Sequence, residues 1–252
     1  MESTCATYVK LLLYIVFVSI NTFILVSSFL YANHPWKMLF FLTVLNLITI
    51  TYYFYSMIYY IIKSKIQKKV LEEYEDNLYF LFIRDTFFKY NFVYAMVVFT
   101  FFWTLMLLGP TFMAYENNLA THLFMIYLHG VVLLVLIIDL IFSKHSVVYI
   151  NKKSDIIILV GLGFMYSILQ LISKYIIKWN AYPFMENLDL KQILVMDFAV
   201  FILLINFYQI YIYIADKLET SRRMLIYKQT MNTSNHELER RPANSNTLEL
   251  EN

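Results

Sequence analysis

Six apolar stretches divide this sequence, and each is long enough to cross a membrane as a helix. They cover roughly residues 10–31, 38–62, 86–108, 123–143, 155–177 and 193–215. About 20 apolar residues span the hydrocarbon core of a bilayer, where a helix satisfies its own backbone hydrogen bonds. The sequence therefore predicts an all-α integral membrane protein, built as a bundle of about six transmembrane helices.

The composition agrees with that prediction and excludes several classes of function. Hydrophobic residues make up 60% of the 252 residues, and charged residues only 15%. A net charge of +2, with no basic run among exposed aromatics, gives no sign of nucleic-acid binding. The single cysteine, Cys5, has neither a disulfide partner nor companions for a metal site. We therefore expect no metal and no cofactor.

The positions of lysine and arginine predict the orientation. With a cytoplasmic N-terminus, fifteen of these residues fall in cytoplasmic segments and three in outer loops, the three being Lys37, Lys178 and Lys191. Cytoplasmic segments of membrane proteins are enriched in these two residues. Both termini are therefore predicted to be cytoplasmic.

The chain divides into two parts by composition. Residues 1–216 form the predicted transmembrane domain, and residues 217–252 form a polar cytoplasmic tail. The tail is rich in Asn, Glu, Ser and Thr and buries too little apolar surface to order itself, so it is predicted to be largely disordered after about residue 228.

Polar residues inside the predicted spans are the candidates for chemistry, because no soluble-enzyme signature is present. His129 is the one histidine within a span. A dry environment favours the neutral imidazole, which is able to act as a general base. The alternative is a histidine that only packs between helices and shares a hydrogen bond with a neighbour.

Depth brings a second residue into the argument. Thr43 lies about five residues into an inward-running span and His129 about six, so both are expected roughly 8 to 9 Å below the outer boundary. A hydroxyl beside an imidazole is the arrangement that activates a nucleophile for acyl transfer. The alternative is a threonine that bonds the carbonyl of its own helix, four residues earlier.

Several short motifs occur in an informative order between residues 36 and 207. They are Trp36-Lys37, Phe41-Leu42-Thr43, Asn46-Leu47, Arg84-Asp85, Trp103, His129, Asp139, Ser143-Lys144-His145, Tyr182-Pro183-Phe184-Met185-Glu186 and Asn206-Phe207. Taken together, the sequence resembles the family of the androgen-induced protein and the androgen-dependent TFPI-regulating protein, which are small multi-pass membrane hydrolases.

This resemblance implies a threonine hydrolase that cleaves fatty acid esters of hydroxy fatty acids to a fatty acid and a hydroxy fatty acid. Matched residue by residue, it places the nucleophile at Thr43 and the base at His129. A lipid ester is already dissolved in the bilayer and would enter laterally between helices. The implied location is the membrane of the endoplasmic reticulum or the plasma membrane, and the oligomeric state stays open.

Donors for an oxyanion hole are harder to predict, because the amides of a continuous membrane helix are used by the helix. Asn46, three residues after Thr43, is one side-chain candidate, and Asp197 lies at a similar depth and is a candidate for orienting His129. Both have the alternative of interhelical packing. Asp139 lies about 15 Å deeper than His129 and is too far to take part. The turn at Tyr182 is interpreted as an interfacial anchor, with a lid over the site as the alternative.

Two other classes of function remain open. The first is a non-catalytic multi-pass carrier of lipid or a small solute, in which His129, Asp139 and Asp197 line a pathway. The second is a regulatory adaptor that works through its charged loop and tail.

Overall fold

The computed structural model describes residues 4–31, 37, 41–66, 78–108, 125–142, 152–180 and 182–240. The main helices are α1 (Thr4–Tyr31), α2 (Leu42–Ile66), α4 (Phe88–Leu108), α6 (Val132–Phe142), α7 (Lys152–Leu171) and α8 (Leu190–Arg240). Shorter elements are α3 (Leu78–Leu81), three π-helical turns at Phe82–Phe87, Tyr127–Val131 and Ile172–Ile176, and a 3-10 turn at Pro183–Asn187. No strand occurs among the described residues.

The helices confirm the prediction of an all-α membrane bundle. Five of the helical segments are long and apolar enough to cross a bilayer, and Tyr127–Ile141 is a shorter apolar segment. The sixth predicted span, 123–143, corresponds to this shorter segment, and its first two residues lie outside the described part of the chain. The protein is therefore a multi-pass membrane protein.

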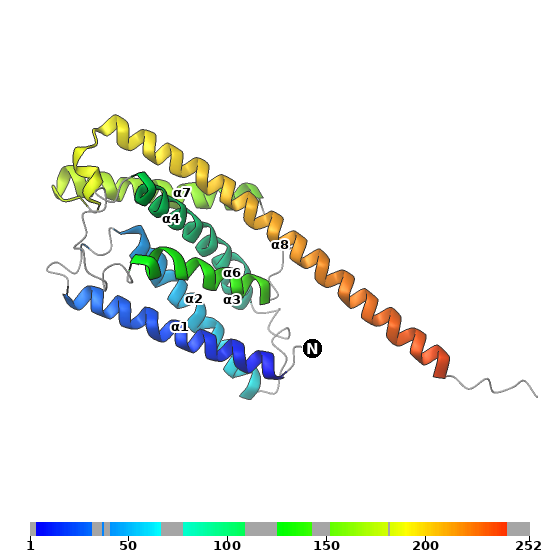
Figure 1. Cartoon of the computed structure of the whole chain (residues 1–252). Helices are drawn as coiled ribbons and strands as arrows, with labels where there is room; N and C mark the ends of the chain where they lie inside the picture. Colours follow the sequence, from blue (N-terminus) through cyan, green and yellow to red (C-terminus); the bar gives the residue numbers. More distant parts are fainter. Residues whose placement is uncertain are drawn as a thin grey trace, which may run out of the picture.

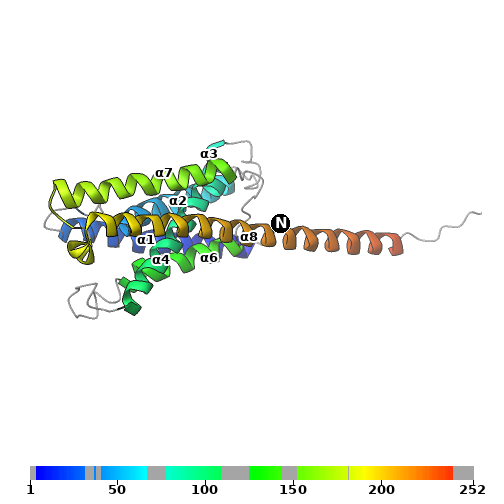
Figure 2. The same ribbon diagram turned by 90° about the horizontal axis from the view of Figure 1, so that it is seen from above.

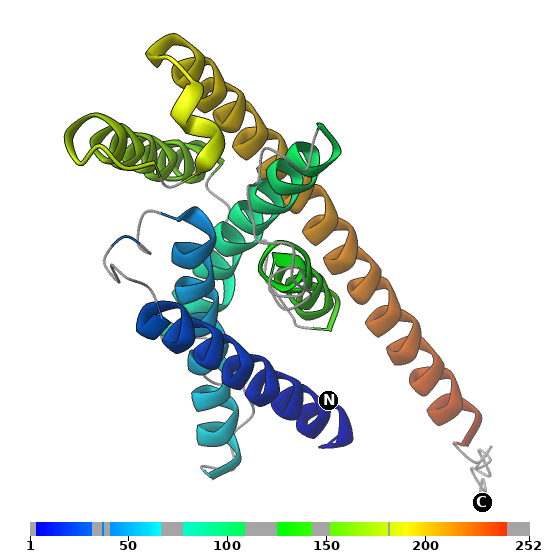
Figure 3. The ribbon, with the colours of Figure 1, turned by 60° about the vertical axis from the view of Figure 1, so that its left-hand side comes forward.

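Helix α4 lies in the middle of the bundle. It packs against α2, α6 and α8, while α1 packs on α2 and α7 packs on α8. Figures 1 and 2 show this arrangement from two directions, and Figure 3 shows how α8 crosses the bundle. No charged residue follows Lys89 in α4. A helix that is apolar on all sides is expected where neighbours cover more than one face.

Aromatic side chains hold the three central helices together. Tyr53 of α2 lies 5.2 Å from Phe88 of α4, measured between ring centroids, and Phe92 of α4 lies 5.5 Å from Tyr211 of α8. Tyr53, Phe88 and Phe92 are almost fully buried. Tilted ring pairs at these separations add stabilisation beyond the area they bury.

A group of buried acidic and basic side chains lies at the end of the bundle opposite Leu42. We call it the ion-pair layer, and its charged members are Arg84, Asp85, Lys89, Asp139 and Asp155. The ammonium of Lys89 lies 2.6 Å from the Asp155 carboxylate, and the Arg84 guanidinium lies 2.8 Å from Asp85. Buried charges are tolerated when they are paired in this way.

Tyrosine hydroxyls complete the partners of the two acids that join different helices. Asp155 accepts hydrogen bonds from Tyr90 at 3.0 Å and from Tyr208 at 2.7 Å. Asp139 accepts one from Tyr53 at 2.5 Å and another from Tyr14. Asp155 therefore joins α7 to α4 and α8, and Asp139 joins α6 to α1 and α2.

Helix α8 is longer than the predicted last span. It runs for 51 residues to Arg240 without interruption, and Figure 1 shows its C-terminal part leaving the bundle on the side of the N-terminus. The prediction of disorder after about residue 228 is therefore not matched up to Arg240, and residues 241–252 lie outside the described part. A helix already nucleated in the membrane extends at little cost through residues such as Leu, Lys, Glu and Arg.

Candidate functional site

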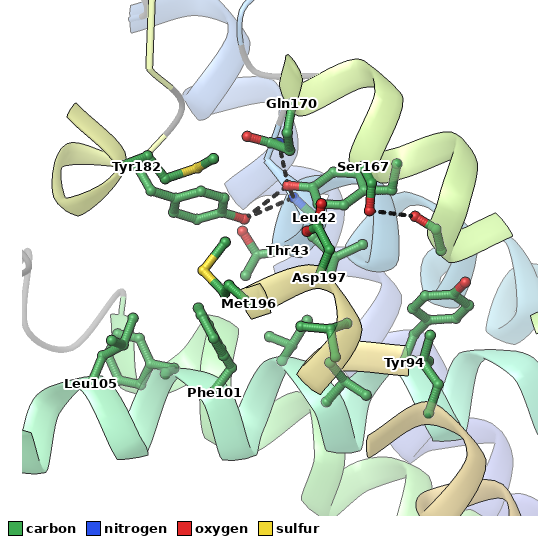
Figure 4. A pocket seen from close by; sticks show the side chains of 18 of the residues that line it. Leu42, Thr43, Tyr94, Phe101, Leu105, Ser167, Gln170, Tyr182, Met196 and Asp197 are labelled. Carbon is green, nitrogen blue, oxygen red and sulfur yellow. Dashed lines mark hydrogen bonds between the residues drawn. The ribbon is translucent and has the colours of Figure 1, made fainter. Parts of the chain in front are cut away.

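A cavity of about 90 Å³ lies between α2, α4, α7, α8 and the loop that follows α7. Most of its lining is apolar and comes from valine, leucine, methionine and phenylalanine side chains. Its polar lining residues are Thr43, Tyr94, His129, Tyr166, Ser167, Gln170, Tyr182 and Asp197. Figure 4 shows this cavity at close range, with Thr43, Tyr182 and Asp197 gathered at the same end. Thr43, His129 and Asp197, which were predicted from widely separated segments, therefore line a single cavity.

Thr43 lies in the first turn of α2. The predicted span begins at residue 38, but the helix begins at Leu42, so Thr43 is its second residue and not its sixth. The side chain is mostly buried, with an exposed fraction of 9%. The first turn of a helix has amide groups that the helix itself does not use. Thr43 therefore lies at the start of α2 and not within a continuous membrane helix.

Hydrogen bonds around this helix end position the threonine. The amide of Leu42 donates to the hydroxyl oxygens of Tyr166, at 3.0 Å, and of Tyr182, at 3.1 Å. The amides of Val44 and Leu45 both donate to the carbonyl of Phe41 at 3.1 Å. Among the described residues, no acceptor is found for the amide of Thr43. The backbone on either side of Thr43 is thus held, and its own N–H remains a possible donor.

His129 lies in a π-helical turn, Tyr127–Val131, where the amide of Val132 bonds the carbonyl of Tyr127. Isolated π turns in helices occur frequently at functional sites. The Nδ1 atom lies 2.9 Å from the carbonyl oxygen of Met125. A carbonyl only accepts, so Nδ1 carries the proton and the lone pair of the neutral ring is on Nε2.

Phe102 fixes the plane of this imidazole. The two rings are stacked, with centroids 3.8 Å apart and an angle of 12° between their planes. The Met125 carbonyl holds one edge of the ring and Phe102 covers one face, so the orientation of the Nε2 lone pair is defined by its surroundings.

The two remaining predicted residues differ in position. Asp197 points into the cavity from α8 (Figure 4), and its Oδ2 atom has no hydrogen-bond partner among the described residues. It is not needed to orient His129 through Nδ1, because Met125 already occupies that position. Asn46 lines a neighbouring cavity of about 280 Å³ instead, together with Leu45 and Thr49. Asn46 is offset from Thr43 by about 60° around the axis of α2, and only Thr43 of the two lines the first cavity.

Asp139 belongs to the ion-pair layer and does not line the cavity. The exclusion of this acid on grounds of depth therefore agrees with the structure.

A cluster around Tyr166 was missed at the level of sequence. Its hydroxyl accepts a hydrogen bond from Nε2 of Gln170 at 2.6 Å and lies 3.1 Å from the hydroxyl of Tyr182. Gln170 was recognisable as a polar residue in a span, but nothing in the sequence joined it to Tyr182. Burial raises the pKa of Tyr182, which is outside the membrane-spanning segments, so its hydroxyl remains protonated.

The loop that carries Tyr182 is fastened to the end of α7. Lys178 adopts a left-handed conformation with φ of 55°, and the Ser173 hydroxyl donates to the carbonyl of Trp179 at 2.6 Å. The ammonium of Lys174 donates to the carbonyls of Met185 and Leu188. Tyr182, Phe184 and Met185 then line the cavity. The loop therefore forms part of the cavity wall. Its interpretation as an interfacial anchor alone does not account for this position.

Comparison with known proteins gives a match to one family model. The model described as FAR-17a/AIG1-like protein matches residues 5–216, which includes every residue that lines the cavity and most of the last candidate span, Leu190–Ser221. No curated protein and no solved structure matches the chain.

Proposed function

The chain belongs to the FAR-17a/AIG1-like family, and on this premise we propose that it is an intramembrane hydrolase of fatty acid esters of hydroxy fatty acids. In this proposal Thr43 is the nucleophile and His129 is the general base. The substrate class comes from the resemblance noted in the sequence, and the assignment of roles is supported by the cavity.

One observation carries the proposal. Thr43 and His129 line the same cavity, and the hydrogen bond of His129 to Met125 leaves Nε2 as the basic nitrogen. Nucleophilic catalysis commonly pairs a hydroxyl with a basic nitrogen. A third group then holds the other nitrogen of the base. Here a backbone carbonyl does what an acid does in the better-known triads.

The reaction follows from these roles. Thr43 Oγ1 attacks the ester carbonyl carbon as its proton passes to Nε2 of His129. The tetrahedral intermediate then loses the alkoxide of the hydroxy fatty acid, which takes the proton from His129 and leaves an acyl-threonine. Water attacks this second ester, giving its proton to the same nitrogen. The fatty acid is released, and the proton returns to Thr43.

The size of the cavity supports a substrate that lies partly in the bilayer. A volume of about 90 Å³ holds the ester group but not two complete acyl chains. The neighbouring cavity of about 280 Å³ shares Leu42, Tyr94 and Tyr166 with the first and is lined mostly by apolar groups. In the proposed complex one chain occupies this second cavity, and the other extends between helices into lipid.

The test is hydrolysis of a fatty acid ester of a hydroxy fatty acid by membranes that contain matched amounts of the protein. Wild type is compared with Thr43→Ala, His129→Ala and the control Thr51→Ala, whose side chain bonds the carbonyl of Leu47 away from the cavity. We expect activity in wild type and Thr51→Ala, and a fall to background in both cavity variants.

Equal activity in the Thr43→Ala and wild-type membranes would refute the assignment of the nucleophile. If no variant hydrolyses any of several lipid esters, the protein is not this enzyme. Transport of labelled lipid or solute across vesicles containing the protein would then test the carrier alternative.

A further inference from the structure

The hydroxyl of Tyr182 lies beside the first turn of α2, in the cavity that Thr43 lines. Its oxygen lies 3.1 Å from the amide nitrogen of Leu42, the residue directly before Thr43. Figure 4 shows the hydroxyls of Tyr182 and Thr43 at the same end of the cavity. The Tyr182 hydroxyl and Thr43 therefore face the same part of the cavity.

The direction of the hydrogen bonds in this cluster follows from counting protons. The Tyr166 oxygen accepts from the Leu42 amide at 3.0 Å and from Nε2 of Gln170 at 2.6 Å. A hydroxyl oxygen has two lone pairs, so both acceptor positions of Tyr166 are used. With the Gln170 amide in this orientation, we assign Tyr166 as the donor and Tyr182 as the acceptor in the 3.1 Å contact between the two tyrosines.

The same count applies to the hydroxyl of Tyr182. The Tyr182 oxygen accepts from Leu42 and from Tyr166, which uses both of its lone pairs. With the donors assigned in this way, the O–H of Tyr182 itself is left to point into the cavity, which Asp197 also lines. Tyr182 is half-buried and lines the cavity, so its O–H is able to donate to a ligand oxygen bound there.

We infer that Tyr182 is a catalytic residue that donates its O–H to the oxyanion of the tetrahedral intermediate formed on Thr43. This inference rests on the proposed function. The amide of Thr43, in the first turn of α2, is the second donor to the same oxygen. A donor held before the reaction begins stabilises the developing charge without reorganisation.

The structure also separates this role from a structural one. Leu42 keeps the Tyr166 hydroxyl as an acceptor when Tyr182 loses its own. The Tyr182 ring packs against Phe41 and Phe184, with centroids 5.6 Å away in each case, and these contacts persist in phenylalanine. Lys174 holds the loop through backbone carbonyls and is unaffected. Tyr182→Phe is thus expected to fold as wild type does.

The experiment compares Tyr182→Phe with Tyr55→Phe, which removes the same hydroxyl from an exposed side chain of α2 with an exposed fraction of 63%. Each variant is given a fatty acid ester of a hydroxy fatty acid and the matching thionoester, in which sulfur replaces the carbonyl oxygen. We expect kcat on the oxygen ester to fall about 100-fold in Tyr182→Phe with KM within about twofold of wild type. Sulfur accepts hydrogen bonds weakly, so the preference for the oxygen ester should fall by a similar factor.

The rate ratio of the two esters does not depend on how much of the protein is folded, so it remains decisive if Tyr182→Phe is less stable. An unchanged ratio, or a kcat equal to that of Tyr55→Phe, overturns the role of Tyr182 while wild-type and Thr43→Ala activities still report on the proposed function. An inactive wild type removes both.

Discussion

Two acids, the buried Asp155 and the half-buried Asp197, differ in how many of their oxygens have hydrogen-bond partners. Asp155 interacts with Lys89, Tyr90 and Tyr208, whereas Asp197 keeps a carboxylate oxygen without a partner among the described residues. Tyr208 and Asp197 are both on α8, about 16 Å apart by helical rise. Paired polar groups stabilise a fold, and polar groups left open in a cavity are available to a ligand. The ion-pair layer should therefore control stability and the cavity should control activity.

The sharpest way to break this comparison is Lys89→Met, which leaves the buried carboxylate of Asp155 without its ion pair. Loss of one partner of a buried pair costs about 3–5 kcal/mol. We expect a large fall in the thermal midpoint measured in detergent, with the activity of each folded molecule unchanged. The double variant Lys89→Met/Asp155→Asn should recover much of the loss, and a single variant as stable as wild type would contradict this view of the layer.

A smaller effect is expected at the seam of α7 and α8, beside the cavity. A Cβ atom at Gly163 would lie 3.0 Å from side-chain atoms of both Leu204 and Phe201. Gly163→Ala should destabilise the protein by about 1–3 kcal/mol, as overpacking does. Gly161→Ala is the matched control, because its Cβ meets no atom within 4 Å, and it should be neutral or stabilising by about 0.5–1 kcal/mol. Equal stability of the two variants, measured by thermal unfolding, would show that the seam is loose.

Phe102→Leu tests the cavity end through activity. The stacked ring keeps His129 in plane, and aromatic pairs contribute about 0.5–1.5 kcal/mol. We expect kcat to fall up to about tenfold, because 1.36 kcal/mol corresponds to a factor of ten, with little change in the thermal midpoint. Phe99→Leu, on the same helix but outside the cavity lining, is the control. Similar kinetics for the two variants would remove Phe102 from the site.

The mildest change concerns the second cavity. Leu45→Trp reduces its volume and should shift the preference toward shorter acyl chains by about two- to fivefold, while activity on short esters is retained. Ile48→Trp, on the same helix but not in the lining, should leave the chain-length profile as in wild type. A profile unaffected by Leu45→Trp would place the acyl chain elsewhere.

Hydropathy was sufficient to predict the fold because lipid imposes one rule on the backbone. The bundle of α-helices and the positions of its spans follow from runs of apolar residues. Helix ends are less predictable, since Phe41 and residues 38–40 are as apolar as the helix they precede, yet α2 begins only at Leu42. The helical extension of α8 to Arg240 was also missed, because a polar segment gives no such signal by itself.

The site was predictable where depth alone mattered. Thr43 and His129 were expected at one level, and both line the cavity. The spacing of three residues predicted that Asn46 would lie beside Thr43, but it did not show that two separate cavities meet at this part of α2. The position of Tyr182 was not predictable from the sequence. It depends on the hydrogen bonds of Lys174 and on the left-handed conformation of Lys178, and no local sequence pattern specifies either.

The length of α8 offers a practical handle on a protein of 30.2 kDa, a mass that is small for imaging single particles. Its 51 residues correspond to about 76 Å of helix, more than twice the roughly 30 Å of hydrocarbon. Asp197 and Arg240 are on the same uninterrupted rod. A helical carrier spliced in phase onto that rod would keep a defined orientation to the cavity and serve as a fiducial for alignment.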